Sequence, residues 1–96
     1  MPQRWIAISA ADLYWRSWND ETVVYNDLTG DTHQLDPLTE TALRAFTEGA
    51  LDAPGLATAM TAFLGEDPGA DLRTWCGQTI DRLAFFGLIE PAADGP

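Results

Sequence analysis

The chain has no lysine, one cysteine and one histidine among its 96 residues. A single cysteine excludes an internal disulfide, which is typical of proteins from reducing compartments. One cysteine and one histidine are also too few for a structural zinc site. No apolar run approaches the roughly 20 residues of a membrane span, and the N-terminus lacks the apolar core of a signal peptide. We therefore expect a cytoplasmic protein that has no membrane attachment.

Positive charge is scarce. Fifteen acidic residues stand against five arginines, which are scattered along the chain, and the net charge is −10. Nucleic-acid binding depends mainly on basic side chains that neutralise phosphates, and an anionic membrane surface would repel this chain. The composition argues against a nucleic acid or a membrane as partner and favours a neutral or basic one, such as a peptide.

A catalytic set is missing as well. A nucleophile needs a base within hydrogen-bonding reach and a third group that orients the base. His33 lies two residues before Leu35 in an expected strand, so we expect it to share that face and pack in the fold. Cys76 lies in the apolar stripe of an expected helix, where a buried thiol acts as a small apolar group. We expect a binding protein without enzymatic activity, cofactor or metal site.

What the chain does contain is enough apolar residues, 46%, to form one core. A length of 96 residues predicts a single domain. We expect order over about residues 4–91 and a frayed tail over residues 92–96.

The first third of the chain has the pattern of strands. Residues 13–18, 22–26 and 32–35 are rich in aromatic and β-branched residues, and short polar turns separate them. This pattern predicts a three-stranded antiparallel meander. Residues 5–8 are interpreted as an additional extended segment or a docked arm.

The apolar period then changes from two to 3.6 residues. Asp36 and Pro37 are typical of a helix start, and Gly49 is typical of a helix end. The predicted fold class is α+β and winged-helix-like: a three-stranded antiparallel N-terminal sheet followed by a three-helix bundle. The second and third helices are expected over about residues 54–64 and 70–86, and residues 88–91 are expected to be extended.

Four tryptophans are many for a chain of this length. We expect Trp15 to point into the core, with Trp18 and Tyr14 on the opposite face of the sheet. Trp75 is expected at the edge of the third helix's apolar stripe. Half-exposed aromatic residues are typical anchors for a partner, but a small core also uses large side chains, and both interpretations stay open. If the third strand is an edge, it can accept an extended peptide as an added strand.

Several stretches resemble the PqqD family of peptide chaperones, and more narrowly its HPr-rel-A system branch. Residues 30–38 read Gly-Asp-Thr-His-Gln-Leu-Asp-Pro-Leu, and residues 83–90 read Leu-Ala-Phe-Phe-Gly-Leu-Ile-Glu, with Phe86 where relatives have leucine. Residues 13–20 and 23–26 add to the likeness, which extends over about residues 4–91.

The resemblance implies three antiparallel strands, three helices and a RiPP recognition element, which binds the leader of a ribosomally synthesised precursor peptide. The leader would lie as an added strand against the third strand and pack on the third helix. The domain would present the precursor to a modifying enzyme, such as a radical SAM protein or, in this branch, an HPr kinase-like protein. By position, the peptide-binding residues would be Thr32, His33, Gln34, Leu35, Trp75, Gln78, Thr79 and Arg82.

Two other interpretations remain. A winged-helix DNA-binding or regulatory module needs a basic third helix, whereas Arg73 and Arg82 are matched there by Asp71 and Asp81. A dimerising accessory subunit of an enzyme complex would pair the same strand edge with a second copy, forming a homodimer.

Overall fold

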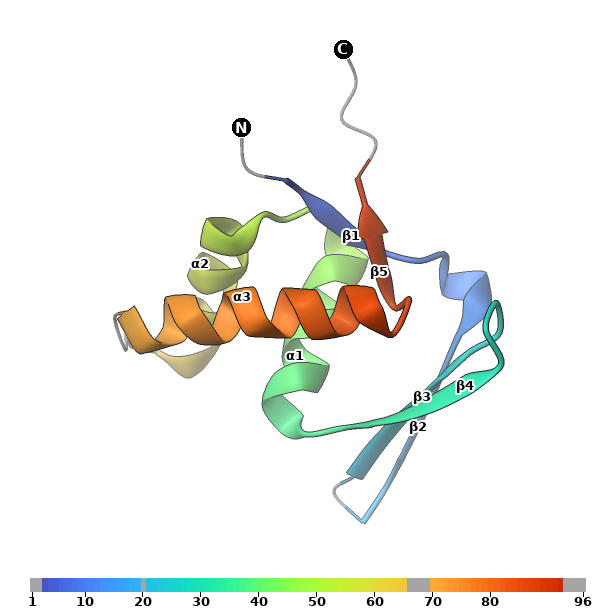
Figure 1. Cartoon of the computed structure of the whole chain (residues 1–96). Coiled ribbons are helices and arrows are strands. Elements are labelled where there is room, and N and C mark those ends of the chain that lie inside the picture. The colour runs from blue at the N-terminus through green and yellow to red at the C-terminus, as the bar shows by residue number, and fades with distance from the viewer. Residues whose placement is uncertain (1–2, 20, 66–69, 93–96) are drawn as a thin grey trace.

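The structure is a computed structural model that describes residues 3–19, 21–65 and 70–92. The fold is α+β, as predicted, with a three-stranded antiparallel sheet followed by three helices (Figure 1). Of the expected tail, only Ala92 falls within the described residues. The elements are β1 (Trp5–Ala7), the 3-10 helix η1 (Ala10–Asp12), β2 (Leu13–Trp18), β3 (Glu21–Asn26), β4 (Asp31–Leu35), α1 (Pro37–Glu48), α2 (Ala53–Leu64), α3 (Ala70–Phe85) and β5 (Ile89–Pro91).

The sheet has the order β2-β3-β4, and all its pairs are antiparallel. Tyr14 lies opposite Tyr25, which in turn lies opposite Thr32. The β3–β4 turn is closed by Gly30, whose φ of 79° is easily reached without a side chain and whose N–H donates to the Asn26 carbonyl at 2.8 Å. Because side chains alternate along each strand, one face of the sheet packs on the helices and the other faces outward.

A second, two-stranded sheet joins the beginning and the end of the described chain. β1 pairs antiparallel with β5, so that Trp5 lies opposite Pro91 and Ala7 opposite Ile89. The Trp5 N–H also donates to the Leu51 carbonyl at 2.7 Å. The extended segments expected near residues 5–8 and 88–91 are confirmed, and the structure adds their pairing.

The helices begin and end where short-range chemistry predicts. The Asp36 carboxylate accepts the Thr39 N–H at 2.7 Å, and the Asp52 carboxylate accepts the Gly55 N–H at 2.7 Å, so both acids cap the first turn of a helix. α2 ends at Gly65, which has a φ of 78°. α3 ends at Phe85, one residue earlier than predicted. No described helix has the length and apolarity needed to cross a membrane.

The core lies between α1, α2, α3 and the inner face of the sheet. Cys76 is one of its members, as expected, and burial raises the pKa of its thiol. The largest fully buried apolar side chains are Phe46, Leu43, Leu56, Met60, Leu83, Leu88 and Val24.

Candidate functional site

β4 forms one edge of the three-stranded sheet. It pairs with β3 on one side, and within the described ranges no strand pairs with its other side. The condition that the sequence left open, that residues 32–35 form a sheet edge, therefore holds within the described residues. Such an edge presents backbone N–H and C=O groups that an added strand can pair with.

The four predicted site residues of β4 divide between the two faces of the sheet. Thr32 and Gln34 are exposed on the outer face. His33 is half-buried on the inner face, and Leu35 is buried in the core. A ligand at this edge would therefore contact mainly the backbone of β4, because the side chain of Leu35 packs in the core.

His33 joins β4 to the end of α3. Its ring stacks on the ring of Phe86, with centroids 4.2 Å apart and an interplanar angle of 17°. Its Nε2 is buried and has no hydrogen-bond partner among the described residues. The packing role expected for His33 is confirmed, and the stack keeps the C-terminal end of α3 beside the β4 edge.

Asn26 makes a second link between the sheet and α3. Its buried Nδ2 donates to the Gly87 carbonyl at 3.0 Å, and its Oδ1 accepts the Leu28 N–H at 2.9 Å. Gly87 follows α3 with a φ of +74°, and a Cβ there would lie 3.2 Å from Asn26 Nδ2. This contact has no signature in the sequence, since a lone asparagine at the end of a strand is typical of a turn residue.

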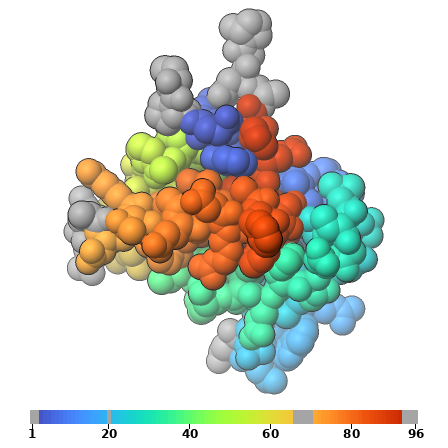
Figure 2. All heavy atoms as spheres, viewed as in Figure 1, coloured from blue at the N-terminus to red at the C-terminus, as the bar shows by residue number. Residues whose placement is uncertain are grey.

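α3 presents a stripe of half-buried and exposed side chains, and its C-terminal end lies next to β4. Trp75 is half-buried against the core, and Gln78 and Arg82 are exposed, as predicted. Phe85 continues the same helical spacing and is 87% exposed. In Figure 2, α3 runs across the visible face of the molecule, and its C-terminal end lies next to the β4 region.

Thr79 does not belong to this stripe. Its side chain is fully buried and its Oγ1 has no hydrogen-bond partner among the described residues. The prediction that Thr79 flanks the apolar stripe was wrong, because its position on the helix turns it into the core with Cys76 and Leu83. Phe85 was not predicted as a site residue, although a phenylalanine off the apolar stripe is a usable signal.

The exposed charges of α3 balance. Asp71 and Asp81 are exposed, as are Arg73 and Arg82. A helix with this balance lacks the basic surface that phosphate binding requires, so the DNA-binding interpretation gains no support. Among the described residues, no three His, Cys, Asp or Glu side chains are grouped so as to hold a metal ion.

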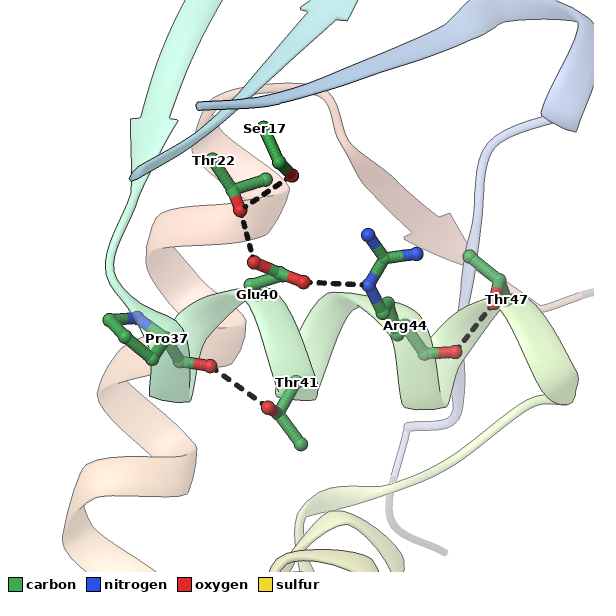
Figure 3. Close-up of polar contacts among 7 residues, drawn as sticks. All are labelled: Ser17, Thr22, Pro37, Glu40, Thr41, Arg44 and Thr47. Carbon is green, nitrogen blue, oxygen red and sulfur yellow. Dashed lines mark hydrogen bonds and ion pairs between the residues drawn. The ribbon is translucent and has the colours of Figure 1, made fainter. Parts of the chain in front are cut away.

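A polar cluster fixes the sheet to α1 on the other side of the site. Glu40 accepts hydrogen bonds from the Thr22 hydroxyl and from Arg44 Nε, the latter at 2.9 Å, and lies between them in Figure 3. The bond from Thr22, followed by that from Arg44, lowers the pKa of the Glu40 carboxyl. The Arg44 guanidinium also lies 4.3 Å from the centre of the Trp15 ring. These contacts fix the face of the sheet that points away from solvent.

Two cavities lie on other surfaces. One, of about 610 Å³, lies between α2 and α3 and is lined by small side chains such as Ala57 and Thr61. The other, of about 750 Å³, is an open hollow on the outer face of the sheet, where Tyr14, Trp18 and Tyr25 line it. The first does not reach β4, and the second includes Thr32 of β4 in its lining.

Comparison with known proteins supports the fold. No family profile and no curated protein matches the sequence. Among solved structures, the chain is similar to TbiB1 in complex with the TbiA(β) leader peptide, with 22% sequence identity and a TM-score of 0.69. The likeness covers 93% of this chain and 100% of that one. At this identity, the shared property is the three-dimensional fold.

Proposed function

We propose that this chain binds the leader segment of a ribosomally synthesised precursor peptide. The observation that carries the proposal is the open edge of β4, which the His33–Phe86 stack holds next to the C-terminal end of α3, where an exposed stripe ends in Phe85. The fold likeness to TbiB1, a protein whose structure holds a leader peptide, supports it. So does the resemblance of residues 30–38 and 83–90 to PqqD-like proteins.

The leader would pair with the backbone of β4 as a fourth strand. Alternate side chains of such a strand point to opposite faces, so every second leader residue would point toward α3. There Trp75 and Phe85 offer apolar contacts, and Arg82 offers a charge-assisted hydrogen bond to an acidic leader residue. His33, stacked on Phe86, forms the floor between strand and helix.

The proposed role is that of a chaperone in the manner of the PqqD family and its HPr-rel-A branch. The domain would hold the precursor for a modifying enzyme, such as a radical SAM protein or an HPr kinase-like protein. A net charge of −10 favours leaders that are neutral or basic overall. The proposed role is binding rather than catalysis, because the sequence offers no nucleophile with an evident base and orienting group.

A titration tests the proposal directly. We would add the leader of the precursor peptide encoded beside this chain's gene to the ¹⁵N-labelled protein. The largest amide shifts are expected on residues 32–35 and along the second half of α3. A titration that saturates while leaving both regions unchanged would rule out this site.

Two matched variants distinguish leader binding at this site from nonspecific binding to exposed aromatic side chains. Phe85→Ser removes an aromatic side chain that is 87% exposed on α3, and Phe63→Ser removes one that is 62% exposed on α2. We expect Phe85→Ser to raise the Kd for the leader about tenfold, which is the usual effect of removing an aromatic side chain that becomes buried on binding. Phe63→Ser is expected to leave the Kd unchanged, and equal effects of the two variants in calorimetry would contradict the proposal.

A further inference from the structure

The outer face of the three-stranded sheet is aromatic, although none of the described helices covers it. Tyr14 is 55% exposed, Trp18 is 50% exposed and Tyr25 is 36% exposed. All three lie on the face opposite to the core-facing Val24 and Leu35. The open face of an antiparallel sheet is normally polar, and a gathered apolar surface marks a place where something binds.

The three rings are placed along a line. Tyr14 and Tyr25 lie opposite each other on neighbouring strands, with ring centroids 6.1 Å apart. Trp18 follows Tyr14 by four residues along β2, which is about 13 Å in an extended strand. The exposed Arg16 stands between them, opposite Val23. Together they line the open hollow of about 750 Å³.

The three rings and Arg16 offer mainly donors, whereas Asp27, which also lines the hollow, carries a carboxylate that only accepts. An indole offers one N–H and no acceptor, a guanidinium offers five N–H groups, and a phenol can donate its O–H. A ligand that suits such a surface is rich in acceptors and apolar rings. Polyproline II segments have free backbone carbonyls, because they form no internal hydrogen bonds, and proline has no N–H of its own.

From this geometry we infer that the outer face of β2 and β3 binds a proline-rich segment of a partner protein in the polyproline II conformation. Five residues in that conformation span about 12 Å, which matches the separation of the tyrosine pair and Trp18. The prolines would pack on the rings, and Arg16 and Trp18 would donate to carbonyls. This is the general mode by which aromatic-lined grooves recognise such segments.

The size and charge of the face favour a short segment over other occupants. A sheet of three strands, each of five or six residues, measures roughly 20 by 15 Å. A stable dimer buries about 800 Å² on each partner, more than twice that projected area. A second copy and a nucleic acid would also be repelled by the net charge of −10, whereas an uncharged segment would not.

The test uses a ten-residue oligoproline as the probe and a glycine-serine peptide of equal length as its control. The four tryptophan side chains give separate indole N–H signals in a ¹H–¹⁵N spectrum of the labelled protein. Oligoproline is expected to shift the indole signal of Trp18 and the amides of Tyr14 and Tyr25. The indole of Trp75, on α3, is expected to stay in place.

Variants make the result specific. Trp18→Thr and, separately, Tyr14→Thr keep strand-forming residues and are expected to weaken oligoproline binding at least tenfold. Phe85→Ser is expected to leave it unchanged, and Trp18→Thr is expected to leave leader binding unchanged. The two sites therefore succeed or fail separately.

Three outcomes would overturn the inference. The first is no shift of the Trp18 indole at millimolar oligoproline, and the second is an equal shift with the glycine-serine peptide. The third is a Trp18 shift that depends on protein concentration alone, with a dimeric mass in sedimentation, which would make a second copy the occupant.

Discussion

At the scale of single residues, the buried hydroxyl of Thr79 lowers the stability of the fold. Its Oγ1 lies inside the core without a hydrogen-bond partner among the described residues. Valine has the same shape and no polar atom, so we expect Thr79→Val to raise the free energy of unfolding by up to about 1 kcal/mol. Urea denaturation measures this. Because the side chain is buried, we expect the Kd for a leader to stay the same. A large change in Kd would show that Thr79 contributes to leader binding.

The pKa of Glu40 reports on the contact between sheet and helix. The hydrogen bond from Thr22 is the largest cause of its lowered pKa, and Arg44 is the next. We therefore expect Thr22→Val and Arg44→Gln each to raise the pKa of Glu40, as read from the Glu40 carboxyl signal in an NMR pH titration. An unchanged pKa of Glu40 in either variant would contradict that cause.

The same group makes a small part of the stability depend on pH. The folded pKa lies below its ordinary value of 4.5, so the contribution is fully present above pH 4.5 and is lost as the pH falls through the folded value. Since the pair with Arg44 is partly exposed, the contribution is expected to stay below about 1 kcal/mol. Glu40→Gln should lack this pH-dependent part when its unfolding is compared with that of the parent chain.

At the scale of elements, the position of α3 depends on the turn that ends it. Gly87 has a φ of +74° and lies against Asn26, so Gly87→Ala combines backbone strain with a close contact. We expect this variant to lower the free energy of unfolding by about 1–2 kcal/mol in urea denaturation.

Gly77 provides the matched control for that substitution. It lies within α3, and a Cβ there would meet nothing within 4 Å. Gly77→Ala is therefore expected to raise the free energy of unfolding by about 0.5–1 kcal/mol, through helix propensity. If both variants changed the free energy of unfolding in the same direction, the left-handed turn at Gly87 would not be what positions the end of α3.

The elements themselves were largely predictable. Turn residues and the change of apolar period placed the strands and helices within one or two residues, because those signals are local. The pairing of β1 with β5 was not predictable, since each strand has three residues and their partners lie at opposite ends of the chain. The errors on α3 have one cause: spacing defines an apolar stripe, but it does not say which neighbouring residue turns inward, as Thr79 does, or outward, as Phe85 does.

At the scale of the whole molecule, composition limits the chemistry of a partner, and the fold limits the position at which it could bind. The net charge of −10 restricts the kind of partner that we propose, and the strand order determines where an added strand could pair with the chain. The edge of β4 followed from strand order, which adjacency along the sequence predicts well. Strand alternation placed Tyr14 and Trp18 opposite Trp15, as the structure confirms, but their exposure beside Tyr25 needed the structure.

The β1–β5 ribbon also determines how the protein responds to mechanical load. The outermost pair, Trp5 with Pro91, is the one nearest to both chain ends. Tension between two neighbours attached at those ends would peel the ribbon apart pair by pair, the geometry in which antiparallel strands resist least. We expect the ribbon, which has three residue pairs, to open before the three-stranded sheet, whose two strand pairings have six and five.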